Sequence, residues 1–234
     1  IDVAKGVEEQ TEKLFEVCKL REVPVITFVN KCDRPGLEPL EILSNIENKL
    51  GIEVVPASWP MGYGQKFQGI YDVQAKKVHV YEKVDHGVKK AITELVSPEE
   101  ALDRSNLSDL EKDAFLEELM LIDDMYEGMD QDLYNAGKVT PVFFGSALNN
   151  FGLDVFLYYF HRLAPPPQGY EYSKGEKRGL EDEFSGFIFK MQANMNPGHR
   201  DCAAFIRIAS GKFVRGQDVV VAHTGKKLKL ATPH

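Results

Sequence analysis

The sequence contains few cysteines and no long apolar segment. Its 234 residues include three cysteines, Cys18, Cys32 and Cys202, which are widely spaced and form no C-x-x-C pair. An odd and scattered set argues against a disulfide framework and a zinc site, and it fits a reducing, cytoplasmic setting. No apolar run approaches the roughly 18 residues that a membrane-spanning helix needs. We therefore expect no membrane span.

The motifs that hold the phosphates of a nucleotide are also missing. No G-x-x-x-x-G-K-[ST] phosphate loop occurs, and no D-x-x-G motif stands in a context that fits contact with a γ-phosphate. Gly211-Lys212 and Gly225-Lys226 lack the upstream glycine and the following Ser or Thr. Ile1-Asp2 has the character of the end of a sheet strand. We therefore expect a piece of a longer protein, with any phosphate loop, Mg²⁺ site and catalytic residues upstream of Ile1.

A motif that can recognise guanine is nevertheless present. Asn30-Lys31-Cys32-Asp33 follows the apolar run 23–29 and has the form N-K-x-D. The Asp33 carboxylate can accept hydrogen bonds from N1–H and the exocyclic amine, which guanine offers and adenine does not. The Asn30 amide can bond the O6/N7 edge and tie neighbouring loops together, while the Lys31 stem can lie along the ring face.

Four residues with one wildcard are weak evidence, but a second loop supports the first. The apolar run 139–145 is followed by Ser146-Ala147-Leu148. Its small residues would let the Ala147 amide approach guanine O6, and Ser146 could orient Asp33. Open α/β sheets bind ligands at the carboxyl ends of parallel strands, so two such loops predict one base-binding site.

Hydrophobic periodicity predicts alternating helices and strands around these loops. We expect helices over 7–20 and 39–50 and strands over 23–29 and 52–57. A third amphipathic helix should run from 153 to a proline stop at 165–167. Its predicted core residues are Leu153, Phe156, Leu157, Phe160 and Leu163.

The fold class we predict is α/β, with a sheet covered by helices, an α+β insertion and a partial antiparallel β-barrel. The sheet domain takes residues 1–58 and 139–165, and an acidic insertion takes 59–138. A linker rich in Pro, Gly and charge spans 166–183. The period-2 pattern of 184–234 predicts the start of the barrel.

Charge is distributed unevenly along the chain, whose formal net charge is −8. Residues 184–234 contain eight Lys/Arg against two Asp/Glu, whereas 56–138 contain nine against 17. A basic terminal domain behind an acidic body suggests a polyanionic partner at one end, although a solvated basic face without a partner is the alternative.

The residues together resemble the translational GTPases that work on the ribosome. The resemblance runs along the whole chain and is carried, besides the two loops, by W-P-M-G at 59–62, T-P-V-F-F-G-S-A-L at 140–148 and F-S-G-F-I-F-K-M-Q-A-N-M-N-P-G-H-R-D at 184–201. The last stretch favours the termination branch of the family over elongation factor G.

This resemblance implies a fold and a function. It implies a P-loop GTPase-type sheet that binds GTP or GDP, with the family's guanine-binding positions falling on Asn30, Lys31, Asp33 and Ser146, Ala147, Leu148. It also implies a cytoplasmic factor that removes stop-codon-reading, class I release factors from the ribosome, and a barrel that touches rRNA. DNA and membranes are not expected partners.

Two other interpretations stay open at this point. Within the enzyme class, elongation factor G and the tetracycline-resistance ribosomal protection proteins share the same layout. In a different class, a non-catalytic ribosome- or rRNA-binding protein could have kept the GTPase scaffold without a phosphate loop.

Overall fold

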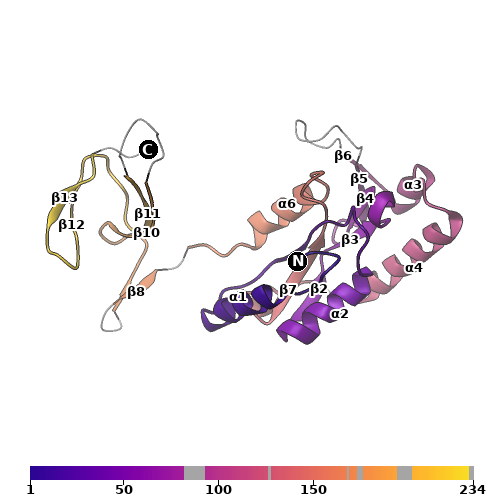
Figure 1. Ribbon diagram of the computed structural model, residues 1–234, viewed down its shortest axis with the longest axis horizontal. Coiled ribbons are helices and arrows are strands. Elements are labelled where there is room, and N and C mark those ends of the chain that lie inside the picture. Colours follow the sequence, from indigo (N-terminus) through magenta and orange to yellow (C-terminus); the bar gives the residue numbers. More distant parts are fainter. Residues whose placement is uncertain (82–92, 126–127, 168, 173–175, 194–201, 232–234) are drawn as a thin grey trace. The chain divides into compact units, whose positions relative to one another are not determined.

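The chain, described here from a computed structural model, divides into two compact units, Ile1–Ala164 and Pro165–His234. The structure describes residues 1–81, 93–125, 128–167, 169–172, 176–193 and 202–231 (Figure 1). Each unit is described by itself below. Among the helices in these ranges, none has both the length and the apolar character required to cross a bilayer.

A parallel sheet lies at the centre of the first unit. β7 (Val139–Phe144) is its middle strand and pairs in parallel with β1 (Thr27–Val29) on one side and β2 (Glu53–Pro56) on the other. Every residue of β7 is buried, as expected for a strand covered on both faces. Residues 1–3 continue the sheet beyond β1 through a parallel bridge between Asp2 and Asn30.

Helices cover both faces of this sheet. Figure 1 shows α6 (Leu153–Leu163) on one side, and α1 (Glu9–Leu20) and α2 (Pro39–Leu50) on the other. The predicted bounds of α2 are confirmed: Pro39 stands in its first turn, and Gly51 ends it in the left-handed conformation with φ of 62°. The first helix begins two residues later than predicted, after the buried Val7.

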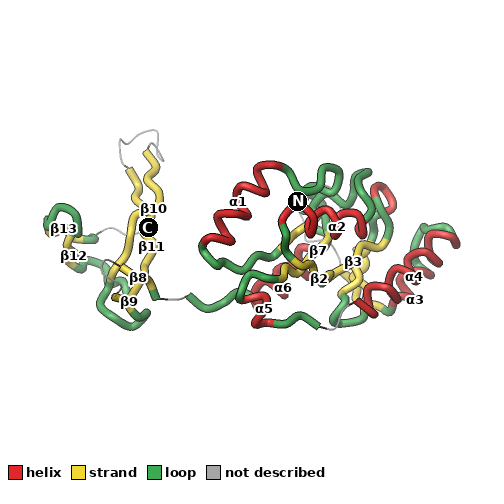
Figure 2. The backbone as a smooth tube through the Cα atoms, turned by 90° about the horizontal axis from the view of Figure 1, so that it is seen from below, coloured by secondary structure: helices red, strands yellow, loops and turns green. Residues whose placement is uncertain are grey.

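The acidic insertion folds around an antiparallel sheet of four strands in the order β3-β4-β5-β6. These strands are β3 (Ser58–Met61), β4 (Gly69–Asp72), β5 (Lys77–Tyr81) and β6 (Thr93–Val96). After them come α3 (Pro98–Asp103), α4 (Asp109–Met125) and α5 (Gln131–Asn135). Figure 2 shows α4 beside β3, and α3 packs against β5. The buried side chains of the insertion belong to the same hydrophobic core as those of the parallel sheet.

Polar contacts fix the insertion onto the sheet domain. The buried Ser58 hydroxyl accepts a hydrogen bond from the backbone N–H of Phe144, at 3.0 Å. The Tyr159 hydroxyl on α6 donates to Asp72 at 2.8 Å, and the Tyr81 hydroxyl on β5 donates to Asp154 on α6 at 2.7 Å. Burial and Asp154 both raise the pKa of Tyr81, so this hydroxyl stays protonated and remains a donor. The insertion thereby helps to position α6, the helix that follows the second loop.

The second unit contains three pairs of antiparallel strands among its described residues. β10 (Ser185–Ala193) pairs with β11 (Cys202–Ser210), and β12 (Asp218–Val220) pairs with β13 (Lys227–Lys229). The predicted linker also contains a short hairpin, in which β8 (Tyr170–Tyr172) pairs with β9 (Glu176–Arg178). These antiparallel pairs agree with the predicted strand pattern, and closure into a barrel stays a prediction. Residues 194–201, which carry part of the resemblance, lie outside the described residues.

Candidate functional site

The two predicted loops lie next to each other at the carboxyl ends of β1 and β7. Because these strands are neighbours and run in parallel, residues 30–33 and 146–151 leave the sheet at the same edge. Backbone hydrogen bonds join them: Cys32 N–H donates to the Gly145 carbonyl at 3.1 Å, and Gly145 N–H donates to the Val29 carbonyl at 2.9 Å. The structure therefore brings together the residues that the sequence singled out.

Asn30 connects the loops through its side chain. Its Oδ1 atom accepts a hydrogen bond from the Ala147 backbone N–H at 2.9 Å and another from the Lys31 N–H at 2.8 Å. This is the bridging role predicted for the amide of Asn30. The Ala147 N–H, which we expected to approach guanine O6, is thus donated to Asn30 in this structure.

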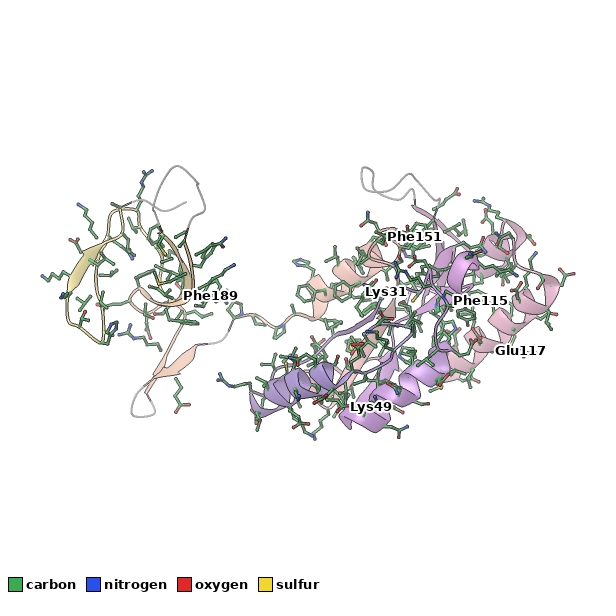
Figure 3. The ribbon with its side chains drawn as sticks, in the orientation of Figure 1. Lys31, Lys49, Phe115, Glu117, Phe151 and Phe189 are labelled. Carbon is green, nitrogen blue, oxygen red and sulfur yellow. The ribbon has the colours of Figure 1, made fainter. Side chains whose placement is uncertain are left out.

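Lys31 adopts an uncommon backbone conformation at the turn. Its φ of 71° lies in the left-handed region, which costs a non-glycine residue roughly 1–2 kcal/mol. The turn is closed by Arg34 N–H, which donates to the Lys31 carbonyl at 2.9 Å. Figure 3 labels Lys31 in the middle of the first unit. Its ammonium forms an ion pair with Asp2 at 2.6 Å.

The second loop is held by its own hydrogen bonds. Ser146 and Phe151 exchange backbone hydrogen bonds of 2.9 and 3.0 Å, so that the loop closes on itself. The buried Ser146 hydroxyl accepts a hydrogen bond from Asn149 Nδ2 at 3.2 Å. The sequence had suggested Asp33 as the partner of Ser146, but the described residues show no hydrogen bond between the two. Ala147 and Leu148 are exposed at its tip. These two residues and the partly exposed Asp33 are therefore accessible to a ligand.

Gly145 is required where the strand meets the second loop. A Cβ atom at this position would lie 2.4 Å from the Phe151 carbonyl oxygen and 2.8 Å from the Phe28 ring. Neither the closed loop nor the ring leaves room for a side chain. The close approach of the two loops therefore depends on a residue without a Cβ.

Sequence reasoning missed two contacts of the first loop. The sequence indicated Asp2 only as part of a strand end, although its carboxylate binds Lys31. Gly64, in the insertion, donates its N–H to the Cys32 carbonyl at 3.0 Å. Neither contact has a local sequence signal, because each joins segments about thirty residues apart that meet only in the folded chain.

Cys32 occupies the variable position of N-K-x-D and faces the interior. The residue is 4 % exposed, and its thiol donates to the Val29 carbonyl at 3.5 Å. Burial raises the pKa of Cys32 to about 12, so the thiol stays protonated at neutral pH. It serves as packing beneath the loop.

Within the described part of the chain, the acidic, His and Cys side chains form no group of three or more that could hold a metal ion. The two loops instead contain an amide, a carboxylate and backbone donors and acceptors, which are groups that can bind a base. These fit a purine ring better than a phosphate–metal complex.

Comparisons with known proteins show which family the chain resembles. Residues 1–166 match the family described as the elongation factor Tu GTP binding domain, and residues 183–234 match elongation factor G domain 2. Along its entire length the chain is similar to proteins named peptide chain release factor 3. It is 45% identical to that of Acaryochloris marina, 48% to that of Trichormus variabilis and 47% to that of Nostoc punctiforme.

The chain spans 43% of the length of each of these three relatives. The family match covers the parallel sheet, the insertion and both loops, and the similarity to release factor 3 continues through the second unit. The chain therefore belongs to the translational GTPase family that carries the elongation factor Tu GTP binding domain, with release factor 3 proteins among its relatives.

Proposed function

We propose that residues 30–33 and 146–148 bind the guanine base of GTP and GDP. Asp33 accepts from N1–H and the exocyclic amine, and Lys31 lies along the ring. Asn30 holds the loops together, Ser146 and Leu148 shape the second loop, and the Ala147 N–H is shared between Asn30 and guanine O6. The observation that carries this proposal is the double hydrogen bond of Asn30 Oδ1, which joins two loops at one sheet edge.

The site and the relatives also support a proposal for the activity of the natural protein. We propose a GTPase of translation termination, which uses GTP hydrolysis to remove stop-codon-reading release factors from the ribosome. Hydrolysis in such enzymes rests on positioning and on stabilising charge at the transferring phosphoryl group. Asn30, Lys31, Asp33 and the second loop are assigned to the base, and none of them is given a part in this chemical step.

The second unit would supply a contact to RNA. Residues 184–234 contain eight Lys/Arg and two Asp/Glu, and phosphate neutralisation by basic side chains drives binding to nucleic acid. We propose that this unit touches rRNA. The acidic insertion, with nine Lys/Arg and 17 Asp/Glu over residues 56–138, is unsuited to that role.

The base assignment is tested by Asp33→Asn in the full-length natural protein. The substitution turns one carboxylate acceptor into a donor, so preference should shift from guanine toward xanthine nucleotides. Affinities for GDP and XDP, measured by competition with a fluorescent nucleotide, report the shift. Asn106→Ala, at an exposed position of the insertion, is the control that should leave both unchanged. Unchanged GDP preference in Asp33→Asn would refute the assignment.

Ribosome-stimulated GTP hydrolysis separates this function from a non-catalytic one. A GTPase of termination should hydrolyse GTP faster with ribosomes and accelerate departure of a labelled class I release factor. A protein that binds ribosomes with the same affinity in the presence and absence of GTP, and hydrolyses none, would be a ribosome-binding scaffold instead.

A further inference from the structure

Asp2 and Lys31 form an ion pair at the edge of the proposed base site. Lys31 Nζ donates to Asp2 Oδ2 at 2.6 Å, and the side chains are 45% and 19% exposed, respectively. The second carboxylate oxygen, Asp2 Oδ1, accepts from the Ala4 backbone N–H at 2.9 Å. Both oxygens of Asp2 are thus engaged, which fixes the direction of the carboxylate toward Lys31.

The backbone places these two residues side by side. Asn30 N–H donates to the Ile1 carbonyl at 2.8 Å, and Val3 N–H donates to the Asn30 carbonyl at 3.0 Å. Residues 1–3 therefore lie in parallel register with the end of β1. Lys31 then turns into the left-handed conformation, and its side chain reaches Asp2 from the next position along the chain.

Residues that follow the first loop in the chain also form hydrogen bonds with the segment that contains Asp2. Leu37 N–H donates to the Val3 carbonyl at 3.0 Å. On α2, Asn45 Oδ1 accepts from Val7 N–H at 2.9 Å, and Lys49 Nζ donates to the Val7 carbonyl at 2.6 Å. Figure 3 labels Lys49 on this helix. The segment around Asp2 is therefore hydrogen-bonded to residues that follow the first loop in the chain.

A lysine side chain has many rotamers, and ordering it on binding costs affinity. The ion pair with Asp2 restricts Lys31 before a ligand arrives. The hydrogen bond from Lys31, and then that from Ala4, lower the pKa of Asp2, which favours the charged carboxylate. The pair can thus preorganise the lysine stem for contact with a base.

We propose that Asp2 is a positioning residue for guanine nucleotide binding, which acts by holding the Lys31 ammonium so that the lysine stem lies along the base. This inference rests on the proposed function of the two loops. Asp2 itself does not touch the nucleotide. Its removal should weaken GDP and GTP binding roughly three- to tenfold, the cost of ordering one flexible side chain.

Asp2→Asn in the full-length natural protein is the direct test. Asparagine keeps an Oδ1 acceptor for Ala4 and loses the charge that binds Lys31. Glu8→Gln is the matched control, because Glu8 pairs with Lys5 at 2.9 Å in the same segment and has no contact with the first loop in the described residues. Dissociation constants for GDP should rise in Asp2→Asn and stay constant in Glu8→Gln.

A double-mutant cycle with Lys31→Met separates positioning from a general structural effect. If Asp2 acts through Lys31, Asp2→Asn should have no further effect on GDP affinity in the Lys31→Met protein. Fully additive losses, or an unchanged affinity in Asp2→Asn alone, would overturn the proposal. If circular dichroism shows that Asp2→Asn folds poorly, Asp2→Ser takes its place in the same cycle, because serine also keeps a side-chain acceptor for Ala4. Additive losses or an unchanged affinity in that cycle would again overturn the proposal.

The outcome for Asp33→Asn keeps the two proposals distinguishable. If Asp33→Asn shifts preference to xanthine while Asp2→Asn leaves GDP affinity constant, the base site stands and the role of Asp2 is refuted. If Asp33→Asn leaves the preference unchanged, the base site itself is refuted, and with it the reason for positioning Lys31.

Discussion

Removal of the Asn30 side chain should loosen the base site without unfolding the unit. Asn30→Ala deprives two backbone donors, the N–H groups of Lys31 and Ala147, of the oxygen they share at 2.8 and 2.9 Å. A typical hydrogen bond contributes about 1 kcal/mol net. Ala147 is exposed, so water can replace part of its bond. We therefore expect the loops to lose about 1.5–2 kcal/mol, which corresponds to a roughly ten- to thirtyfold increase in local opening.

Amide hydrogen exchange, followed by mass spectrometry in the full-length protein, measures this opening directly. Peptides covering residues 30–33 and 145–148 should exchange roughly ten- to thirtyfold faster, while peptides from β7 should stay protected. Asn30→Asp, which keeps the acceptor oxygens, should preserve most of the protection. Asn106→Ala serves as a control, because its partner Gln68 lies within the insertion. Unchanged exchange in Asn30→Ala would refute the conclusion that this side chain joins the loops.

Two further predictions concern ionisable groups. Burial raises the pKa of the Cys32 thiol to about 12. A maleimide at pH 7 should therefore modify the exposed Cys202 and should react with Cys32 only after denaturation. Peptide mapping that finds Cys32 labelled in the native protein would contradict this. Hydrogen bonds from Lys66 and Ser108 hold the pKa of Glu111 at about 2, below its ordinary 4.5, so its stabilising effect is complete above pH 4.5 and is lost as pH falls toward 2. Glu111→Gln should therefore flatten the decrease in melting temperature over this interval, whereas Glu117→Gln on the exposed face of the same helix should not; equal profiles for wild type and Glu111→Gln would contradict the assignment.

Helix α6 shows where periodicity was insufficient. The sequence predicted Phe156, Leu157 and Phe160 as core residues, but Leu157 and Phe160 are 57% and 47% exposed, and the structure buries Val155 and Tyr159. Apolar side chains occur nearly all round this helix, so its pattern cannot select one face. Packing against β7 and the hydrogen bond from Tyr159 to Asp72 select it instead.

The amino-acid sequence by itself determined the features that are local in the chain. The ends of α2 follow from Pro39 and Gly51, and N-K-x-D and S-A-L stand directly after buried strands, so that a predicted parallel sheet was enough to place both loops at one edge. These signals survive without tertiary information because each rests on neighbouring residues.

Only the tertiary structure decided which distant groups support those loops. The partner of Lys31 is Asp2, and the partner of the Cys32 carbonyl is Gly64. No sequence pattern around a single carboxylate or glycine predicts which residue, some thirty positions away, it will contact. Such contacts are set by the register of parallel strands and by the docking of the insertion, and these exist only once the core has packed.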